Sequence, residues 1–314
     1  MYSLHFYGQM IADATRMRAY GAALRQTVRT DSTVMDLGCG PGVFAVLACK
    51  LGARRVYAVE PENVIGLARE VAAANGCADR IEFFDKLSTE ITLPEPVSII
   101  ISDLRGVLPW FEQHIPSIVD ARTRLLARDG VLIPHRDILW AALVEAPAQY
   151  AELVGPWQDN KVGLDLSAGT RLITNNWRKT HITPEQFLVE PVCWTSIDYY
   201  EVESADIHGR VSWQAARNGT AHGVAVWFDS ELVDGVRLSN HPAAPKMIYG
   251  VGLFPFSQPV AVAEGERIEF RLAADLIQDG YVWRWETDFP RTTFKQSTFY
   301  GVPLSAAQLR KSAQ

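Results

Sequence analysis

The stretch VMDLGCGPGV, residues 34–43, decides the fold of this 314-residue chain. Its apolar start is typical of a strand, its glycine cluster of a tight turn, and the breaker-free run 43–51 of a helix. The alternation continues with strands expected at 55–60, 80–84 and 97–102 and a helix over 63–75. This β-α-β order predicts an α/β fold with a doubly wound parallel sheet, whose ligands bind at the carboxyl ends of the strands.

The spacing of the glycine turn favours one cofactor class over another. Gly42 follows Gly38 by four residues (42 − 38), whereas a dinucleotide fingerprint spaces its first and third glycines further apart. Asp36 is expected to point a carboxylate into the same crevice, which suits a cationic ligand and repels a pyrophosphate. S-Adenosylmethionine is such a cation, and Glu60 at the next strand end can accept hydrogen bonds from both of its ribose hydroxyls. The alternative is a plain tight turn with an exposed acid.

The sequence pattern changes near Pro134. Short alternating runs such as 223–232 and 267–272, separated by Gly and Pro, predict a second, mostly antiparallel β domain. Residues 150–190 are less regular, and we expect them to form a partly helical insertion. Trp283 and Trp285 share one face of a strand and are expected to pack in its core.

Composition excludes several classes of protein. The net charge of −6 argues against a nucleic-acid partner. Cys39, Cys49, Cys77 and Cys193 have no Cys-x-x-Cys spacing, so we expect no zinc ribbon and no disulfide framework. The apolar runs are shorter than the roughly 20 residues of a membrane span, and the N-terminus lacks an export signal. A cytoplasmic protein without a membrane partner is expected.

These motifs resemble class I S-adenosylmethionine-dependent methyltransferases, and more narrowly the protein arginine methyltransferase family in a divergent bacterial form. The resemblance fades after about residue 150. It implies a Rossmann-like cofactor domain over 1–134, an antiparallel β-barrel substrate domain over 135–314 whose last strand lies within 291–300, and a homodimer formed through an arm at about 155–180. The matching segments are 10–16, 36–42, 58–60, 102–112 and 130–134.

The resemblance also assigns the cofactor-binding residues. An N-terminal amphipathic helix, expected over 9–25, would close over the cofactor. Its Arg16 would pair with the methionine carboxylate of the cofactor; the alternative is a surface arginine. The predicted cofactor-binding set is Met10, Arg16, Asp36, Gly38, Cys39, Gly40, Gly42, Glu60 and Ser88.

The loop 102–112 contains two acids, Asp103 and Glu112, nine residues apart (112 − 103). In the resembled family such a pair grips the guanidinium of the substrate, so we expect both acids to be catalytic and no metal to be needed. The family usually has Glu at the first position, and the shorter Asp103 implies a pocket of different shape. Arg105 can pair with one of the acids, which gives the alternative of an ion-pair cluster without a substrate role.

A third element of the family is altered. Its Thr-His-Trp loop aligns with Met247-Ile248-Tyr249, which lacks the histidine, and the nearby His241 is expected to be exposed. Tyr249 and Tyr2 are the predicted substrate contacts. The predicted reaction is methyl transfer to a guanidino nitrogen of arginine in a protein or peptide. The alternatives are a methyltransferase for a small-molecule amine or guanidine and an inactive cofactor-binding partner, and a dinucleotide oxidoreductase is disfavoured.

Overall fold

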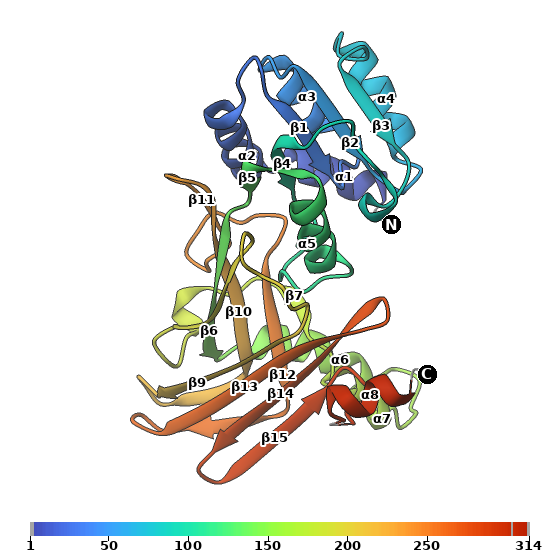
Figure 1. The fold of residues 1–314 in the computed structure, drawn as a ribbon. Coiled ribbons are helices and arrows are strands. Elements are labelled where there is room, and N and C mark those ends of the chain that lie inside the picture. The colour runs from blue at the N-terminus through green and yellow to red at the C-terminus, as the bar shows by residue number, and fades with distance from the viewer. Residues whose placement is uncertain (1–2, 303, 313–314) are drawn as a thin grey trace.

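Helices packed around a parallel sheet form one part of the chain, and two antiparallel sheets form the other (Figure 1). The computed structural model describes residues 3–302 and 304–312. No helix in these ranges is both long enough and apolar enough to cross a membrane. The predicted fold class, an α/β part with a doubly wound parallel sheet followed by an antiparallel β part, is confirmed.

The parallel sheet has the strand order β3-β2-β1-β4-β5. Strand β1 is central and buried along its whole length, as expected for a strand covered on both faces. The strand order reverses between β1 and β4, so a crevice opens at their carboxyl ends. The elements are β1 (Thr33–Leu37), α3 (Val43–Lys50), β2 (Arg55–Val59), α4 (Ile65–Ala74), β3 (Ile81–Phe84), a short 3₁₀ turn (Ser88–Glu90), β4 (Val97–Ser102), α5 (His114–Arg124) and β5 (Leu126–Ile133).

The N-terminal helix differs from the prediction. The pattern predicts one helix over 9–25, whereas the structure has α1 (Leu4–Ala12) and α2 (Ala14–Thr27). Asp13 between them has extended backbone, and its side chain accepts a hydrogen bond from the backbone N–H of Arg16 at 3.0 Å. An aspartate that caps a new helix in this way competes with continuation of the previous one. The break therefore has a local cause that the apolar pattern does not reveal.

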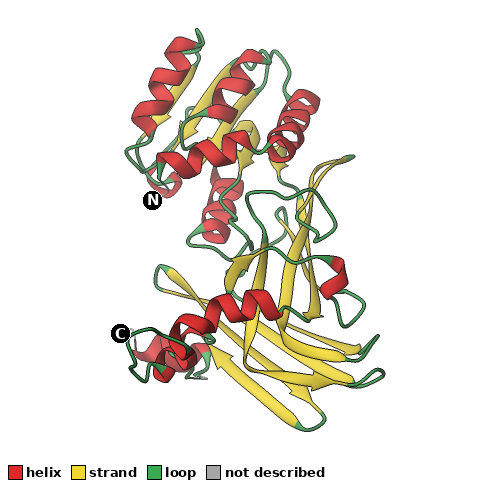
Figure 2. Cartoon of the chain, turned by 180° about the vertical axis from the view of Figure 1, so that it is seen from behind, coloured by secondary structure: helices red, strands yellow, loops and turns green. Residues whose placement is uncertain are grey.

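The antiparallel part consists of a six-stranded and a four-stranded sheet, drawn in yellow in the lower half of Figure 2. One sheet has the order β7-β12-β10-β6-β8 with β11 paired to β10, and the other has the order β15-β14-β13-β9. Trp283 and Trp285 are buried, which confirms their predicted place in the core. The strands are β6 (Arg136–Val144), β7 (Arg178–Thr180), β8 (Val192–Asp198), β9 (Ile207–Gln214), β10 (Gly219–Val233), β11 (Val236–Ser239), β12 (Val251–Val262), β13 (Arg267–Ile277), β14 (Gly280–Phe289) and β15 (Thr292–Ser297).

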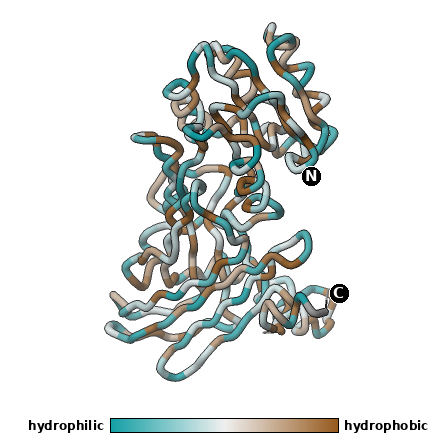
Figure 3. The backbone as a smooth tube through the Cα atoms, viewed as in Figure 1, coloured by the Kyte–Doolittle hydropathy of each residue, from teal (hydrophilic) through white to brown (hydrophobic). Residues whose placement is uncertain are grey.

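The insertion at 150–190 is partly helical, as predicted. It contains α6 (Pro147–Gln158) and α7 (Ser167–Ile173), then β7 and a 3₁₀ turn (Pro184–Gln186). Figures 1 and 2 place α6 and α7 beside α8 (Ala306–Ser312), at one edge of the antiparallel sheets. Hydrophobic residues, brown in Figure 3, run along the central strands of the parallel sheet, while the insertion is of mixed hydropathy.

Candidate active site

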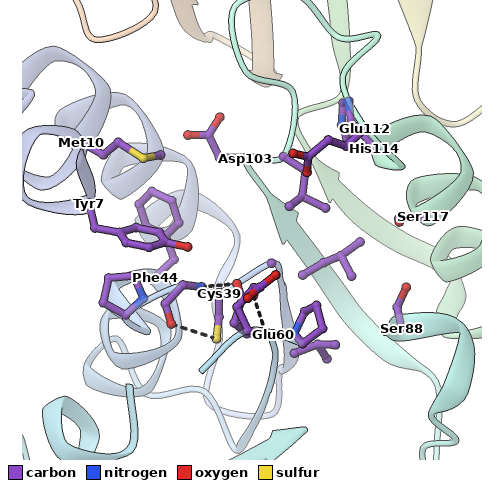
Figure 4. A pocket seen from close by; sticks show the side chains of 18 of the residues that line it. Tyr7, Met10, Cys39, Phe44, Glu60, Ser88, Asp103, Glu112, His114 and Ser117 are labelled. Carbon is purple, nitrogen blue, oxygen red and sulfur yellow. Dashed lines mark hydrogen bonds between the residues drawn. The ribbon is translucent and has the colours of Figure 1, made fainter. Parts of the chain in front are cut away.

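A cavity of about 300 Å³ opens where the parallel strands end (Figure 4). Its walls come from α1, the glycine turn after β1, the loop after β4 and the start of α5. Asp36 and Gly42 of the predicted set do not line it. The predicted residues that do are Met10, Arg16, Gly38, Cys39, Gly40, Glu60, Ser88, Asp103 and Glu112.

The glycine turn brings bare backbone to the edge of this cavity. Gly40 has a left-handed φ of 51°, and a Cβ atom there would lie 2.7 Å from a ring carbon of Tyr7. Gly42 serves packing instead, because a Cβ atom there would lie 2.9 Å from the Cβ of Ala68 on α4. Burial raises the pKa of Cys39, so its thiol stays neutral in the cavity wall.

Asp36 does not point into the crevice, contrary to the expectation. Its carboxylate is buried and accepts a hydrogen bond from the backbone N–H of Ala45 at 2.8 Å. Burial raises the pKa of Asp36 to about 7, although the bond from Ala45 opposes this shift. The acid therefore fixes the first turn of α3 to the end of β1. The sequence correctly predicts the strand end at which Asp36 lies, but it does not predict the direction in which the side chain points.

Glu60 does reach the cavity. One carboxylate oxygen accepts a hydrogen bond from the backbone N–H of Gly40 at 3.0 Å, and the other accepts one from the N–H of Glu62 at 3.1 Å. Burial raises the pKa of Glu60, while these two backbone bonds lower it. Figure 4 shows its side chain beside Cys39, on the side of the cavity formed by the glycine turn. Each oxygen keeps one lone pair for a ligand.

Asp103 is enclosed by groups of the chain itself. Its Oδ2 accepts hydrogen bonds from Arg16 Nε at 2.6 Å and from the Tyr249 hydroxyl at 2.6 Å, and its Oδ1 accepts one from the Tyr20 hydroxyl at 2.9 Å. Arg105 Nε lies 3.7 Å from Oδ1. Burial alone would raise the pKa of Asp103, but the charges of Arg16 and Arg105 and the hydrogen bonds outweigh it and lower the pKa. The ionised carboxylate is thus neutralised before any substrate binds.

Glu112 lies outside this cluster. It is exposed, lines the same cavity and, among the described residues, makes no ion pair within 4.0 Å. Its φ of 44° is in the left-handed region, an uncommon conformation for a non-glycine residue. Gly106 has a left-handed φ of 59°, and a Cβ atom there would lie 3.2 Å from the Cγ atom of Phe111, so the loop folds back closely on itself at this point. The loop therefore brings both acids to one cavity.

Arg105 joins the acid loop to the antiparallel sheets. Its buried guanidinium forms an ion pair with Asp137 on β6 and lies 4.3 Å from the ring centroid of Phe228. The other oxygen of Asp137 accepts a hydrogen bond from the Tyr199 hydroxyl at 2.7 Å. The main partner of Arg105 is thus an acid outside its own loop, and Asp103 is a longer-range partner. This network holds the acid loop against β6.

A second cavity of about 180 Å³ adjoins the first, and Met10, Asp103 and Phe111 line both. Tyr249 lines the second cavity only. The backbone N–H of Ile248 donates to Asp13 at 2.8 Å, which ties this loop to the junction of α1 and α2. The remaining lining residues are Phe6, Gly106, Val107, Trp177, Lys179 and Ile248.

Two further predictions concern residues near this loop. His241 was expected to be exposed, but it is half-buried, with its ring centroid 5.4 Å from that of Trp227. The alternation of the sequence could not reveal this edge-to-face contact, because Trp227 lies on β10, outside the loop that contains His241. Tyr2 lies outside the described residues.

Sequence reasoning missed several residues around Arg16, which is itself only 6% exposed and so is not a surface arginine. Tyr20 follows Arg16 by one helical turn, and this i,i+4 spacing was a usable signal. Phe44, whose ring centroid lies 4.9 Å from the Arg16 guanidinium, had no such signal. His114 also lines the larger cavity; burial lowers its pKa to about 4, and its Nδ1 lies 2.8 Å from the carbonyl oxygen of Pro109.

Comparisons with known proteins match both parts of the chain. Residues 18–141 match the family described as ribosomal protein L11 methyltransferase (PrmA), and residues 135–279 match the arginine methyltransferase oligomerization subdomain. Human protein arginine N-methyltransferase 2 is 29% identical over 90% of this chain and 68% of its own length. An arginine N(omega)-methyltransferase of Streptomyces achromogenes subsp. streptozoticus is 29% identical over 84% of this chain and 74% of its own. A probable protein arginine N-methyltransferase 6 of Arabidopsis thaliana is also 29% identical, over 71% of this chain. The matched region spans only about half (53%) of the length of that relative.

Solved structures match over nearly the whole chain. The Trypanosoma brucei PRMT1 enzyme-prozyme heterotetrameric complex with AdoHcy has a TM-score of 0.85 at 25% identity and covers 95% of this chain and 98% of its own. The crystal structure of Arabidopsis thaliana protein arginine methyltransferase 10, in an open conformation, has a TM-score of 0.80 at 22% identity. The match covers 94% of this chain and 97% of that one. The arrangement of the parallel and antiparallel parts is therefore shared with these proteins.

Proposed function

Since this chain belongs to the protein arginine methyltransferase family, we propose that it transfers a methyl group from S-adenosylmethionine to a guanidino nitrogen of arginine. One observation carries the proposal: the glycine turn, the buried Glu60 and the two acids of the loop after β4 surround one cavity. The predicted acceptor is an arginine side chain in a protein or peptide. A small-molecule guanidine is the second candidate, because the position of the family's histidine holds Ile248.

The residues of the larger cavity fit S-adenosylmethionine. Glu60 is buried there, and each of its oxygens retains a lone pair for a ribose hydroxyl. The space left open at Gly40 is what a ligand needs to approach the backbone closely. Arg16 lines the cavity and offers a guanidinium suited to a carboxylate. When bound, S-adenosylmethionine supplies an electrophilic methyl group on a positively charged sulfur.

The two acids have unequal capacity to orient an acceptor. Glu112 has both oxygens available for a bidentate pair with a guanidinium. In Asp103, Oδ2 already accepts two hydrogen bonds and Oδ1 accepts one, so a single acceptor position remains. We therefore assign most of the guanidinium binding to Glu112 and one hydrogen bond to Asp103. Holding the acceptor nitrogen in one orientation supplies much of the rate of such a reaction.

The test is transfer of isotopically labelled methyl groups from S-adenosylmethionine to arginine-containing peptides and to free arginine. Glu112→Gln is expected to fold and to bind the cofactor normally but to lose roughly a hundredfold in turnover, because a neutral amide cannot form the charged bidentate pair. Glu70→Gln is the matched control, since Glu70 is exposed on α4 and lies outside the cavity. Turnover of Glu112→Gln equal to that of the control would reject the role of Glu112.

We also propose that the chain has two domains, 1–134 and 135–314, and forms a homodimer through the arm at about 155–180. The match of residues 135–279 to an oligomerization subdomain supports the dimer. Apolar side chains exposed together on the arm support it as well: Trp157 is 38% exposed, Val162 70% and Leu164 62%. Clustered exposed apolar residues mark an interaction surface.

A cytoplasmic location is a further part of the proposal. All four cysteines are free, and Cys39, Cys49 and Cys77 are buried. Free thiols are typical of proteins kept in a reducing compartment.

A further inference from the structure

Lys179, on β7, is a cation in the wall of the smaller cavity, which Asp103 and Tyr249 also line. Its ammonium donates a hydrogen bond to the carbonyl oxygen of Ile248 and lies 5.4 Å from the ring centroid of Phe6. These contacts hold the ammonium beside the loop that contains Tyr249. Two of its three N–H donors remain for a ligand. Within the described ranges of the chain, no carboxylate lies within ion-pair distance of it.

Two more basic residues lie beside Lys179. Burial, and then the charges of Lys246 and Lys179, lower the pKa of His181 and so favour its neutral form, which leaves the two lysines as the source of positive charge here. Lys246 likewise has no acidic partner among the residues that the structure describes, whereas Arg178, next to Lys179, pairs with Glu152 at 2.8 Å. A patch of uncompensated positive charge beside a cavity attracts an anion and repels a cationic peptide.

The same small cavity also has an apolar wall. Phe6, Val107, Trp177 and Ile248 contribute to it, and the ring of Trp177 stacks on that of Phe254 with 6.0 Å between centroids. Such a wall suits a chain of methylene groups. One space of about 180 Å³ therefore presents a carboxylate, an apolar wall and an unpaired ammonium.

Of the two candidate acceptors, we propose that the cavity favours the second, in the form of a small guanidino acid such as free arginine whose carboxylate binds Lys179. This inference rests on the proposed methyl transfer to a guanidino nitrogen and names its acceptor. Free arginine carries a guanidinium, a methylene chain, a carboxylate and an α-ammonium, and the first three match the acids, the apolar wall and the Lys179 ammonium in turn. In a peptide, a neutral amide replaces that carboxylate, and Lys179 keeps no counter-ion.

The experiment compares L-arginine with L-argininamide, which differs only in having a neutral amide in place of the carboxylate, and with an arginine-rich peptide. The wild-type full chain is expected to use L-arginine with a kcat/KM at least about tenfold above that for L-argininamide. Lys179→Met keeps the apolar stem but removes the charge, and should lower kcat/KM for L-arginine by roughly tenfold to a hundredfold, mainly through KM. It should leave L-argininamide unaffected. Lys179→Arg should restore most of the preference, and Lys50→Met is the control, because Lys50 is exposed at the end of α3 and lines neither cavity.

The outcomes separate the acceptor from the reaction. Equal use of L-arginine and L-argininamide, or an arginine-rich peptide preferred by wild type and Lys179→Met alike, would overturn the guanidino-acid proposal while leaving methyl transfer intact. Transfer to no guanidine at all would reject the proposed function and the acceptor with it. Binding of L-arginine, measured by calorimetry in the presence of S-adenosylhomocysteine, should weaken in Lys179→Met by the same factor as KM rises.

Discussion

Replacing Asp103 by Asn is expected to destabilise the folded protein as well as to slow methyl transfer. The Asp103 carboxylate lies 2.6 Å from Arg16 Nε and 3.7 Å from Arg105 Nε, and its side chain is 5% exposed. Asn has nearly the same shape without the charge, so Arg16 would retain a buried guanidinium without a counter-ion. Removing one partner of a buried ion pair costs about 3 to 5 kcal/mol. Because Arg105 keeps Asp137, we expect the lower end, about 3 kcal/mol.

The assay is the free energy of unfolding from urea titration, with the melting temperature as a second measurement. A loss of about 3 kcal/mol corresponds to a melting temperature lower by roughly 5 to 10 °C. Glu112→Gln is the matched control, because Glu112 is exposed and forms no ion pair among the described residues, and it should stay within about 0.5 kcal/mol of wild type. Equal stability of Asp103→Asn and wild type would refute the inference that Arg16 and Arg105 neutralise Asp103.

The same contacts predict how this stabilisation depends on pH. The folded pKa of Asp103 lies below its unfolded value, because the charges of Arg16 and Arg105 outweigh the effect of burial. Its contribution is therefore complete above the unfolded pKa of about 4 and is lost as the pH falls through the folded pKa. The difference in unfolding free energy between wild type and Asp103→Asn should be constant near pH 7 and shrink below about pH 4. A difference that stays constant down to about pH 2 would contradict the lowered pKa.

Two further predictions test the cofactor site and the arm. Gly40→Val should abolish binding of S-adenosylhomocysteine in calorimetry, because φ is 51° at this position and a Cβ atom would lie 2.7 Å from the Tyr7 ring; unchanged binding would remove the cofactor assignment. Leu164→Asp places a charge on the exposed apolar arm and should shift the mass in sedimentation from dimer to monomer, whereas a persistent dimer would exclude this part of the arm from the interface.

The parallel sheet was predictable because its signals are local. The strands expected at 55–60 and 97–102 are observed at Arg55–Val59 and Val97–Ser102. Continuous β-branched runs and a glycine turn specify strand and turn within a few residues, without reference to distant parts of the chain. The break of the N-terminal helix also has a local cause, since Asp13 caps α2, but the apolar pattern runs through it and conceals it.

The partners of charged side chains could not be predicted in the same way. Arg16 and Asp103 are 87 residues apart in sequence, and Asp103 and Tyr249 are 146 apart. Only the packing of α2, the acid loop and the antiparallel sheets brings these groups together. Asp36 shows the same limit at short range, because its position at a strand end does not tell whether its carboxylate faces the cavity or, as observed, the start of α3.

Two departures from the resembled family, the shorter acid at 103 and the altered loop ending at Tyr249, are in direct contact. Asp103 is shorter than Glu by one methylene, about 1.5 Å, and the Tyr249 hydroxyl donates to its Oδ2 at 2.6 Å. Burial and the charge of Asp103 raise the pKa of Tyr249 far above its ordinary value, so the hydroxyl stays protonated and remains a donor. The two changes therefore act together. Asp103 lines both cavities, whereas Tyr249 lines only the smaller one. The two changes therefore alter the shape of the part of the site that binds the acceptor, and they leave the glycine turn and Glu60 unchanged.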